Sequence, residues 1–257
     1  MDCRIIKIGG NVVDNPELLR QFLNDFAAIE GAKILVHGGG VMASRLQKAL
    51  GQVPVMAEGR RITDAETLKA VTMVYAGWCS KNIVAGLQGT GCSAVGLSGA
   101  DADLIRAVKR PVLSIDYGYA GDVDPHGVNT DFLLMLLRAG ITPVICAITH
   151  DGHGQLLNTN ADTIASCIAS ALVPVGNISL TYCFEKDGVL YDKDDDGSVI
   201  PEIGPEDYRT LKEEGRIAAG MIPKLDNAFN ALHSGVGRVT ITHARCLQSG
   251  KGTIIRL

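Results

Sequence analysis

Two lysines near opposite ends of this 257-residue chain stand close to glycines. Lys7 lies in IIKIGGN, and Lys224 lies in AGMIPKL. Ammonium groups offset the negative charge of a phosphoryl group during its transfer, while backbone amides hold its oxygens. The P-loop pattern G-x-x-x-x-G-K-[ST] occurs nowhere in the sequence. The residues therefore indicate phosphoryl transfer on an architecture other than the P-loop fold.

Two glycine-rich turns each follow an apolar, strand-like segment. HGGG at 37–40 stands between KILVH and an amphipathic segment, and GGN at 9–11 follows CRIIKI. Glycines allow backbone N–H groups to approach an anion closely, and the start of a helix adds partial positive charge. Because parallel strands present their carboxyl ends at one sheet edge, we expect both turns to face the same ligand.

A polar turn, LLNTNAD at 156–162, precedes an alanine-rich apolar segment. Ordinary helix capping explains Asn160 as the N-cap and Asp162 in the first turn. Asn158 is not needed for capping, which indicates that it points at a ligand. Asp162 has a second interpretation, because one carboxylate between two lysines would orient both and keep them charged.

Short β-branched segments alternate with amphipathic ones, which predicts βαβ units, a mostly parallel sheet and two lobes that share it. The stretch 105–123 is typical of a β-hairpin excursion. The expected strands are CRIIKI, KILVH, SAVGL, TPVIC, NISLTYC and RVTIT. The expected helices span 16–29, 41–50, 64–87, 129–139, 161–172 and 224–234, with Gly31, Gly51, Gly140 and Gly235 as C-terminal caps.

Composition narrows the class of protein. A net charge of −4 and 5% aromatic residues argue against a nucleic-acid-binding protein. The seven cysteines are scattered and form no C-x-x-C pair, so neither disulfides nor a zinc site is expected, and no metal site is assigned to the protein itself. With no signal peptide and no membrane-length apolar run, the expected location is the cytoplasm, away from membranes.

Eight segments, in order, make the chain similar to the amino acid kinase family: IKIGGN, LVHGGG, EGRRIT, GLSGADADLI, GYAGDV, LLNTNAD, GMIPKL and the terminal GTII. The resemblance implies a three-layer αβα sandwich around an open, mainly parallel sheet. It also implies two lobes, 1–174 for acylamino acid binding and dimerisation and 175–257 for ATP. EGRRIT with LLNTNAD is most similar to members that phosphorylate the γ-carboxylate of N-acetyl-L-glutamate, the second step of arginine biosynthesis.

The resemblance also implies a role for each matching residue. Lys7 and Lys224 resemble the lysines that stabilise the transferring phosphoryl group, and Asp162 resembles the carboxylate that organises them. The residues that match the acceptor site are Gly39, Gly40, Arg61 and Asn158. The residues that match the site for ATP, with Mg²⁺ carried by the nucleotide, are Gly10, Glu185, Gly220 and Met221.

The chain departs from the family pattern at three places. Phe184 and Glu185 replace a Ser/Thr-Asp pair on the nucleotide side, and Ala219 replaces a glycine. Arg60 stands where an apolar residue is common, and it raises N-succinyl-L-glutamate as an alternative acceptor. Because neighbouring residues of an extended strand leave opposite faces, we expect Arg60 to point away from the pocket beside Arg61, which favours the acetyl substrate.

Several alternatives stay open. Glutamate 5-kinase, aspartate kinase, carbamate kinase and uridylate kinase share the fold, and a non-catalytic regulatory homologue is a different class of protein. Arginine-sensitive members of the family carry an extra N-terminal helix that links dimers into a hexamer. Only a few residues precede IIKI, so we expect a homodimer without feedback inhibition by arginine.

Overall fold

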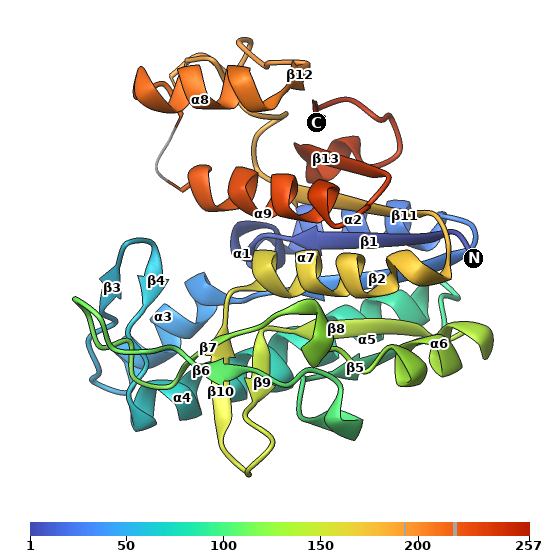
Figure 1. The fold of residues 1–257 in the computed structure, drawn as a ribbon. Helices are drawn as coiled ribbons and strands as arrows, with labels where there is room; N and C mark the ends of the chain where they lie inside the picture. The colour runs from blue at the N-terminus through green and yellow to red at the C-terminus, as the bar shows by residue number, and fades with distance from the viewer. Residues whose placement is uncertain (193, 218–219) are drawn as a thin grey trace.

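An eight-stranded sheet runs through the described residues, 1–192, 194–217 and 220–257, of the computed structural model (Figure 1). All neighbouring strands are parallel except β13 and β14. From one edge to the other the strands are β12 (Glu202–Ile203), β14 (Thr253–Ile255), β13 (Arg238–His243), β11 (Ile178–Phe184), β1 (Cys3–Ile8), β2 (Ala32–His37), β8 (Thr142–Cys146) and β5 (Ala94–Leu97).

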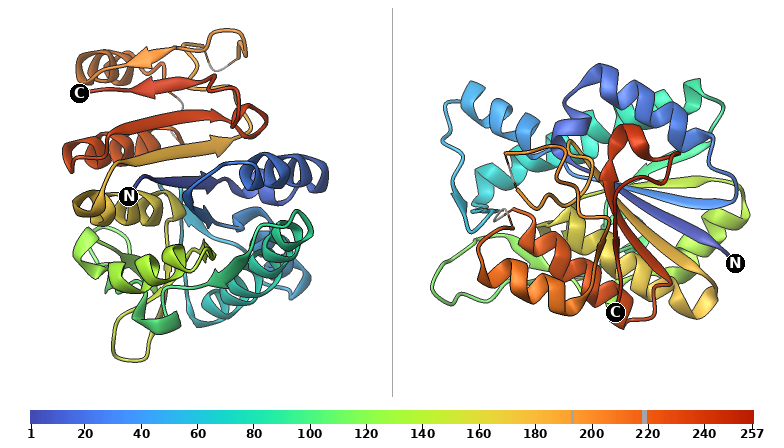
Figure 2. Two further views of the ribbon diagram at one scale, coloured as in Figure 1. Left: turned by 90° about the vertical axis from the view of Figure 1, so that its right-hand side faces the viewer. Right: turned by 90° about the horizontal axis from the view of Figure 1, so that it is seen from above.

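Helices cover both faces of this sheet (Figure 2). On one face lie α6 (Thr130–Arg138), α7 (Ala161–Leu172) and α9 (Ile222–His233), and α8 (Pro205–Glu213) packs against α9. On the other face lie α2 (Pro16–Ala27) and α5 (Ser80–Gly89). The predicted three-layer αβα sandwich with a mainly parallel sheet is therefore confirmed.

Shorter elements connect these layers. The remaining helical segments are α1 (Gly10–Val13), α3 (Gly40–Ala49), α4 (Ala65–Thr72), the π-helical η1 (Met73–Cys79) and the 3-10 turns η2 (Asp101–Asp103), η3 (Pro125–Gly127), η4 (Val173–Val175) and η5 (Ala244–Cys246). The smaller sheets are the hairpin β3 (Met56–Ala57) with β4 (Arg60–Arg61), and four strands in the order β6 (Val108–Lys109), β7 (Ala120–Asp122), β10 (Leu156–Thr159) and β9 (Ile148–His150).

Burial explains why these segments form the centre of the sheet. The central strand β1 pairs with β11 on one side and β2 on the other, and its Ile5, Ile6 and Ile8 are at most 1% exposed. Parallel strands that are covered on both faces are apolar throughout, which is the pattern seen in CRIIKI and KILVH. Lys7 interrupts the apolar run of β1, and its side chain therefore needs a polar partner.

A buried lysine satisfies carbonyl groups at the end of helix α2. Lys33, at the start of β2, is 7% exposed and donates hydrogen bonds to three backbone carbonyl oxygens. The acceptors are Phe26 at 3.0 Å, Ala27 at 2.7 Å and Ile29 at 2.6 Å. The last carbonyls of a helix have no partner within the helix, so one ammonium group satisfies several of them.

Most predicted elements are confirmed, and two differences matter. The antiparallel pairing of β6 with β7 confirms the predicted hairpin excursion. The segment η1 interrupts the single helix expected at 64–87. The sequence did not predict it, because hydrophobic periodicity carries no signal for a π-helical turn. Helix α8 was not predicted. None of the described helices is both long enough and apolar enough to cross a membrane.

Candidate active site

Three charged side chains from separate elements meet at the carboxyl end of the sheet. Lys7 is near the end of β1, Asp162 is in the first turn of α7, and Lys224 is in the first turn of α9. The Nζ atom of Lys7 lies 2.6 Å from Oδ1 of Asp162, and the Nζ atom of Lys224 lies 3.0 Å from Oδ2. One carboxylate thus contacts both lysines, as the second interpretation of Asp162 predicts.

Burial and charge oppose each other at this cluster. Burial alone would raise the pKa of Asp162, but the charges and hydrogen bonds of Lys7 and Lys224 outweigh it and lower the pKa to about 2. Burial lowers the pKa of Lys7, and the charge of Asp162 acts in the opposite direction. The carboxylate is therefore ionised at neutral pH, and its charge favours the ammonium form of Lys7.

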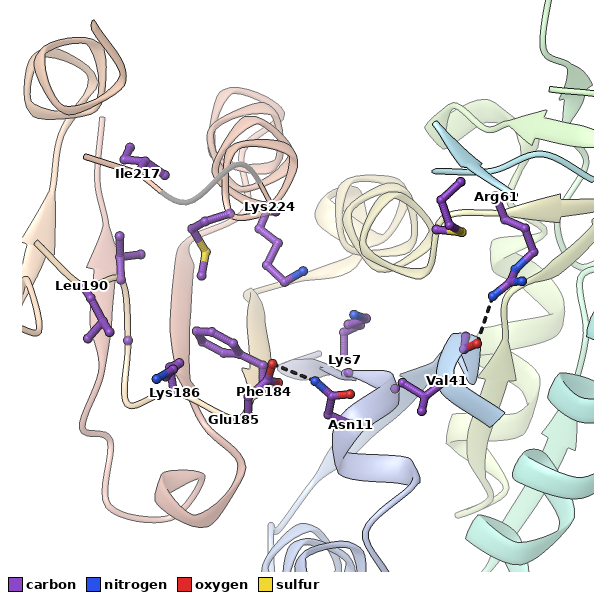
Figure 3. A pocket seen from close by; sticks show the side chains of 18 of the residues that line it. Lys7, Asn11, Val41, Arg61, Phe184, Glu185, Lys186, Leu190, Ile217 and Lys224 are labelled. Atoms are coloured by element: carbon purple, nitrogen blue, oxygen red, sulfur yellow. Dashed lines mark hydrogen bonds between the residues drawn. The ribbon is translucent and has the colours of Figure 1, made fainter. Parts of the chain in front are cut away.

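Two cavities open beside the cluster. The larger has a volume of about 620 Å³, and Figure 3 shows Lys7 and Lys224 between its Phe184 side and its Arg61 side. The smaller has a volume of about 220 Å³ and is lined by Asp162 and Asn158. Every residue predicted for the site lines at least one cavity. Glu185, Gly220, Met221 and Lys224 line the larger cavity; Gly39, Asn158 and Asp162 line the smaller; Lys7, Gly10, Gly40 and Arg61 line both.

The two glycine turns lie against each other. A Cβ atom built on Gly10 would lie 3.4 Å from the backbone nitrogen of Gly40, which shows how closely the turns approach. Helix α3 begins at Gly40, so its free N–H groups face the site. The turns expected to face one ligand therefore meet.

Polar contacts fix Arg61. Its guanidinium donates to Oε1 of Gln47 at 2.6 Å, to the backbone oxygen of Gly40 at 2.9 Å and to Oγ of Ser44 at 2.8 Å. Asn158 lies in the same cavity and donates from Nδ2 to Oγ1 of Thr63 at 3.0 Å. The sequence reasoning missed Ser44 and Gln47, although their spacing of three places them on one helix face.

The expectation for Arg60 was wrong, because both arginines line the smaller cavity. The side chains do diverge: Arg61 reaches α3, while Arg60 lies near Arg110 and Tyr117. Strand β4 contains only these two residues. Burial, followed by the charge of Arg110, lowers the pKa of Arg60.

Two of the residues that depart from the family pattern line the larger cavity. Phe184 and Glu185 follow one another at the end of β11, and both face the cavity. Asn11 donates from Nδ2 to Oε1 of Glu185 at 2.8 Å (Figure 3). This bond joins the turn after β1 to the turn after β11. Ala219 lies outside the described residues.

Comparison with known proteins places the chain among relatives. The model of the amino acid kinase family matches residues 2–243. The chain belongs to the amino acid kinase family. A protein of Phocaeicola vulgatus named acetylglutamate kinase is 56% identical over 98% of this chain and 97% of its own length. Proteins with the same name from Parabacteroides distasonis, at 55% identity over 97% of both chains, and Methanopyrus kandleri, at 40% over 98% and 99%, are further relatives.

Solved structures of other proteins show the same fold. N-acetylglutamate synthase from Neisseria gonorrhoeae, in complex with coenzyme A and N-acetyl-glutamate, matches with a TM-score of 0.84 at 23% identity. The match covers 99% of this chain and 59% of that one. Carbamate kinase from Giardia lamblia bound to AMP-PNP matches with a TM-score of 0.69 at 15% identity, over 98% and 97% of the two chains.

Proposed function

We propose that this chain phosphorylates N-acetyl-L-glutamate with ATP, forming N-acetyl-L-glutamyl 5-phosphate and ADP for arginine biosynthesis. The observation that carries the proposal is the cluster of Lys7, Asp162 and Lys224 between a larger and a smaller cavity. The names of relatives that match almost the whole chain support the choice of acceptor over other family substrates.

The arrangement suits a reaction that needs no general base. A γ-carboxylate has a reference pKa near 4.3, so it is already a nucleophile at neutral pH. One of its oxygens attacks the γ-phosphorus of ATP while the bond to the β–γ bridging oxygen breaks and ADP leaves. Lys7 and Lys224 offset the negative charge of the moving phosphoryl group, and Asp162 holds both ammonium groups in place.

Each cavity receives one substrate in this proposal. The smaller cavity takes the acceptor, with Arg61 on its α-carboxylate and Asn158 on its amide region. The larger takes MgATP, with Gly10 at the phosphates and Glu185, Gly220 and Met221 along the nucleotide. We accordingly assign residues 1–174 to the acceptor and residues 175–257 to the nucleotide.

A coupled assay of ADP release tests the proposal directly. Purified protein with MgATP is given N-acetyl-L-glutamate, N-succinyl-L-glutamate or free glutamate in separate reactions. We expect turnover with an acylated glutamate and little with free glutamate. ADP release that no acylated glutamate stimulates would refute the proposal and favour the non-catalytic homologue.

N-succinyl-L-glutamate is a second candidate acceptor, and the position of Arg60 favours it. Arg60 lines the smaller cavity, where the succinyl tail would place a second carboxylate. The neighbouring acids have other partners: Asp122 pairs with Arg110, and Glu58 accepts a hydrogen bond from the Tyr117 hydroxyl at 3.0 Å. Arg60 therefore adds a positive charge to the wall of this cavity, where an added anionic group would be favoured.

The variant Arg60→Leu separates the two acceptors. If the protein prefers the acetyl compound, its kcat/KM for N-acetyl-L-glutamate exceeds that for the succinyl compound and changes little in the variant. If Arg60 reads a succinyl tail, the native protein prefers the succinyl compound, and Arg60→Leu lowers kcat/KM for that compound alone.

We also propose that two copies of the chain associate. Met73 is 54% exposed and Trp78 is 62% exposed, and both lie on η1. Large apolar side chains that gather on one surface are typical of a protein–protein contact. Light scattering of the native protein would give the mass of a dimer, and Trp78→Glu would shift it towards a monomer; a native monomer would contradict the proposal.

A further inference from the structure

The π-helical segment η1 brings a tyrosine into the smaller cavity. Residues 73–79 continue α4 into α5 with a wider helical turn, and such turns frequently occur at functional sites. Tyr75 lies within this segment, is 5% exposed and lines the smaller cavity beside Arg61 and Asn158. No part of the chemistry described above uses it.

The ring of Tyr75 packs under the glycine turn. A Cβ atom built on Gly39 would lie 2.8 Å from Cδ1 of Tyr75, closer than real Cβ atoms approach, and 3.1 Å from Cε1. The ring therefore forms the floor of this turn and requires glycine at position 39. Any shift of the ring would also move the backbone amides that the turn presents to a ligand.

The hydroxyl of Tyr75 reaches the place where Arg61 enters the cavity. A Cβ atom built on Gly40 would lie 3.8 Å from the Tyr75 hydroxyl oxygen and 3.8 Å from Nη2 of Arg61. Burial raises the pKa of Tyr75 although the charge of Arg61 acts against it, so the phenol is neutral at pH 7. A guanidinium has only donors, so the phenol oxygen faces it as an acceptor and keeps its own hydrogen for another partner.

We propose that Tyr75 is an acceptor-binding residue whose hydroxyl donates a hydrogen bond to the carboxylate that Arg61 binds. The inference rests on the proposed function, because it assigns this carboxylate to the acylated glutamate. The Tyr75 ring packs against Gly39, and its hydroxyl lies near the guanidinium of Arg61. Tyr75 therefore sets the affinity for the acceptor. The nucleotide, in the larger cavity, does not contact Tyr75 in this arrangement.

The variant Tyr75→Phe tests this role, because it keeps the ring and removes only the hydroxyl. A hydrogen bond to a charged group is strong enough that its loss should raise KM for the acylated glutamate roughly tenfold or more. We expect kcat and KM for MgATP to change less than about threefold, and the melting temperature to stay the same. Tyr208→Phe is the matched control, since its hydroxyl contacts Asp226 at 2.7 Å and should leave acceptor KM unchanged.

Calorimetric titration with N-acetyl-L-glutamate and with N-succinyl-L-glutamate keeps this test independent of turnover. A native protein that binds either compound without phosphorylating it would refute the proposed function, and weaker binding by Tyr75→Phe would still support the role of the hydroxyl. Unchanged acceptor KM and binding in Tyr75→Phe would overturn the inference. An equal loss for both substrates with a lowered melting temperature, or no binding of either compound by the native protein, would also overturn it.

Discussion

Lys7 and Lys224 approach opposite oxygens of a single carboxylate, although they come from the first strand and the last long helix of the chain. The shared partner, Asp162, is 5% exposed. Two ammonium groups at one place would repel each other without this negative charge. The carboxylate thus permits a pair of cations to stand where a phosphoryl group would pass between two cavities.

Removing either lysine should slow turnover without unfolding the protein. We expect Lys7→Ala and Lys224→Ala each to lower kcat by roughly 10²–10³, because groups that stabilise developing charge have effects of this size. Steady-state kinetics at saturating MgATP, with melting curves to verify folding, measure the effect. Near-normal turnover by a folded variant would remove that lysine from the mechanism.

An added methyl group at Gly39 should disturb the site. In Gly39→Ala the Cβ atom would meet the Tyr75 ring, and 3.0 Å away it would also meet Sγ of Cys79. Overpacking of this kind typically lowers the free energy of unfolding by about 1–3 kcal/mol. We expect a matching fall in stability and at least a tenfold fall in kcat/KM for the acceptor.

Gly77→Ala is the matched control for this substitution. Gly77 lies in η1, and a Cβ atom built there would meet nothing within 4 Å. Alanine in a helical position with free space is expected to keep or raise stability. If Gly39→Ala and Gly77→Ala behave alike in urea denaturation and in kinetics, the close packing under the turn has no functional effect.

The buried ammonium of Lys33 should matter for stability and not for catalysis. Lys33→Met keeps the length of the side chain but removes the donor shared by three carbonyl oxygens, of which that of Phe26 keeps a hydrogen bond from the Ile29 N–H at 3.2 Å. Because each unsatisfied buried group costs about 1–3 kcal/mol, we expect the free energy of unfolding to fall by about 3 kcal/mol. Lys69→Met removes an exposed ion pair with Glu66 instead, and should cost at most about 1 kcal/mol. Equal effects of the two variants would contradict this account.

His37 should make the protein sensitive to mild acid. Burial lowers its pKa to about 4, partly offset by the hydrogen bond from Nδ1 to the backbone oxygen of Gly38 at 2.8 Å. An unfolded histidine titrates near 6.5, so between about pH 6.5 and pH 4 the unfolded chain binds more protons. The folded state therefore loses stability as the pH falls through this window.

Urea denaturation at pH 7 and pH 5 measures this contribution. The lowered pKa of His37 should reduce the free energy of unfolding by about 2 kcal/mol at pH 5. His37→Gln removes the titrating group. Between pH 7 and pH 5, the free energy of unfolding of this variant should therefore fall by about 2 kcal/mol less than that of the native protein. A variant with the same pH dependence as the native protein would show that His37 does not drive the change.

Local sequence predicts much of the candidate site, because its main parts are short segments with fixed geometry. Helix α7 begins and ends where expected, and Asn160 caps it by accepting hydrogen bonds from the N–H groups of residues 162 and 163. A carboxylate in the first turn after such a cap has a defined direction. Lys7 lies near the end of the parallel strand β1, and it meets Lys224 of α9 through Asp162 of α7.

The parts that sequence could not predict depend on contacts between distant segments. The π-helical turn that carries Tyr75 has the composition of an ordinary helix. The direction of Arg60 depends on a two-residue strand and on Arg110, which lies on a separate loop. The partners of Lys33 are backbone carbonyl groups, which have no signature in the sequence.

Within the described part of the chain, five residues line both cavities: Lys7, Gly10, Gly40, Met56 and Arg61. A molecule bound in one cavity therefore contacts residues that also bind the molecule in the other cavity. Thermodynamic linkage then requires reciprocity, so that whatever factor the nucleotide contributes to acceptor affinity, the acceptor returns to nucleotide affinity. When both molecules are present they displace water from this common wall, so the phosphoryl group would then meet the acceptor and not water.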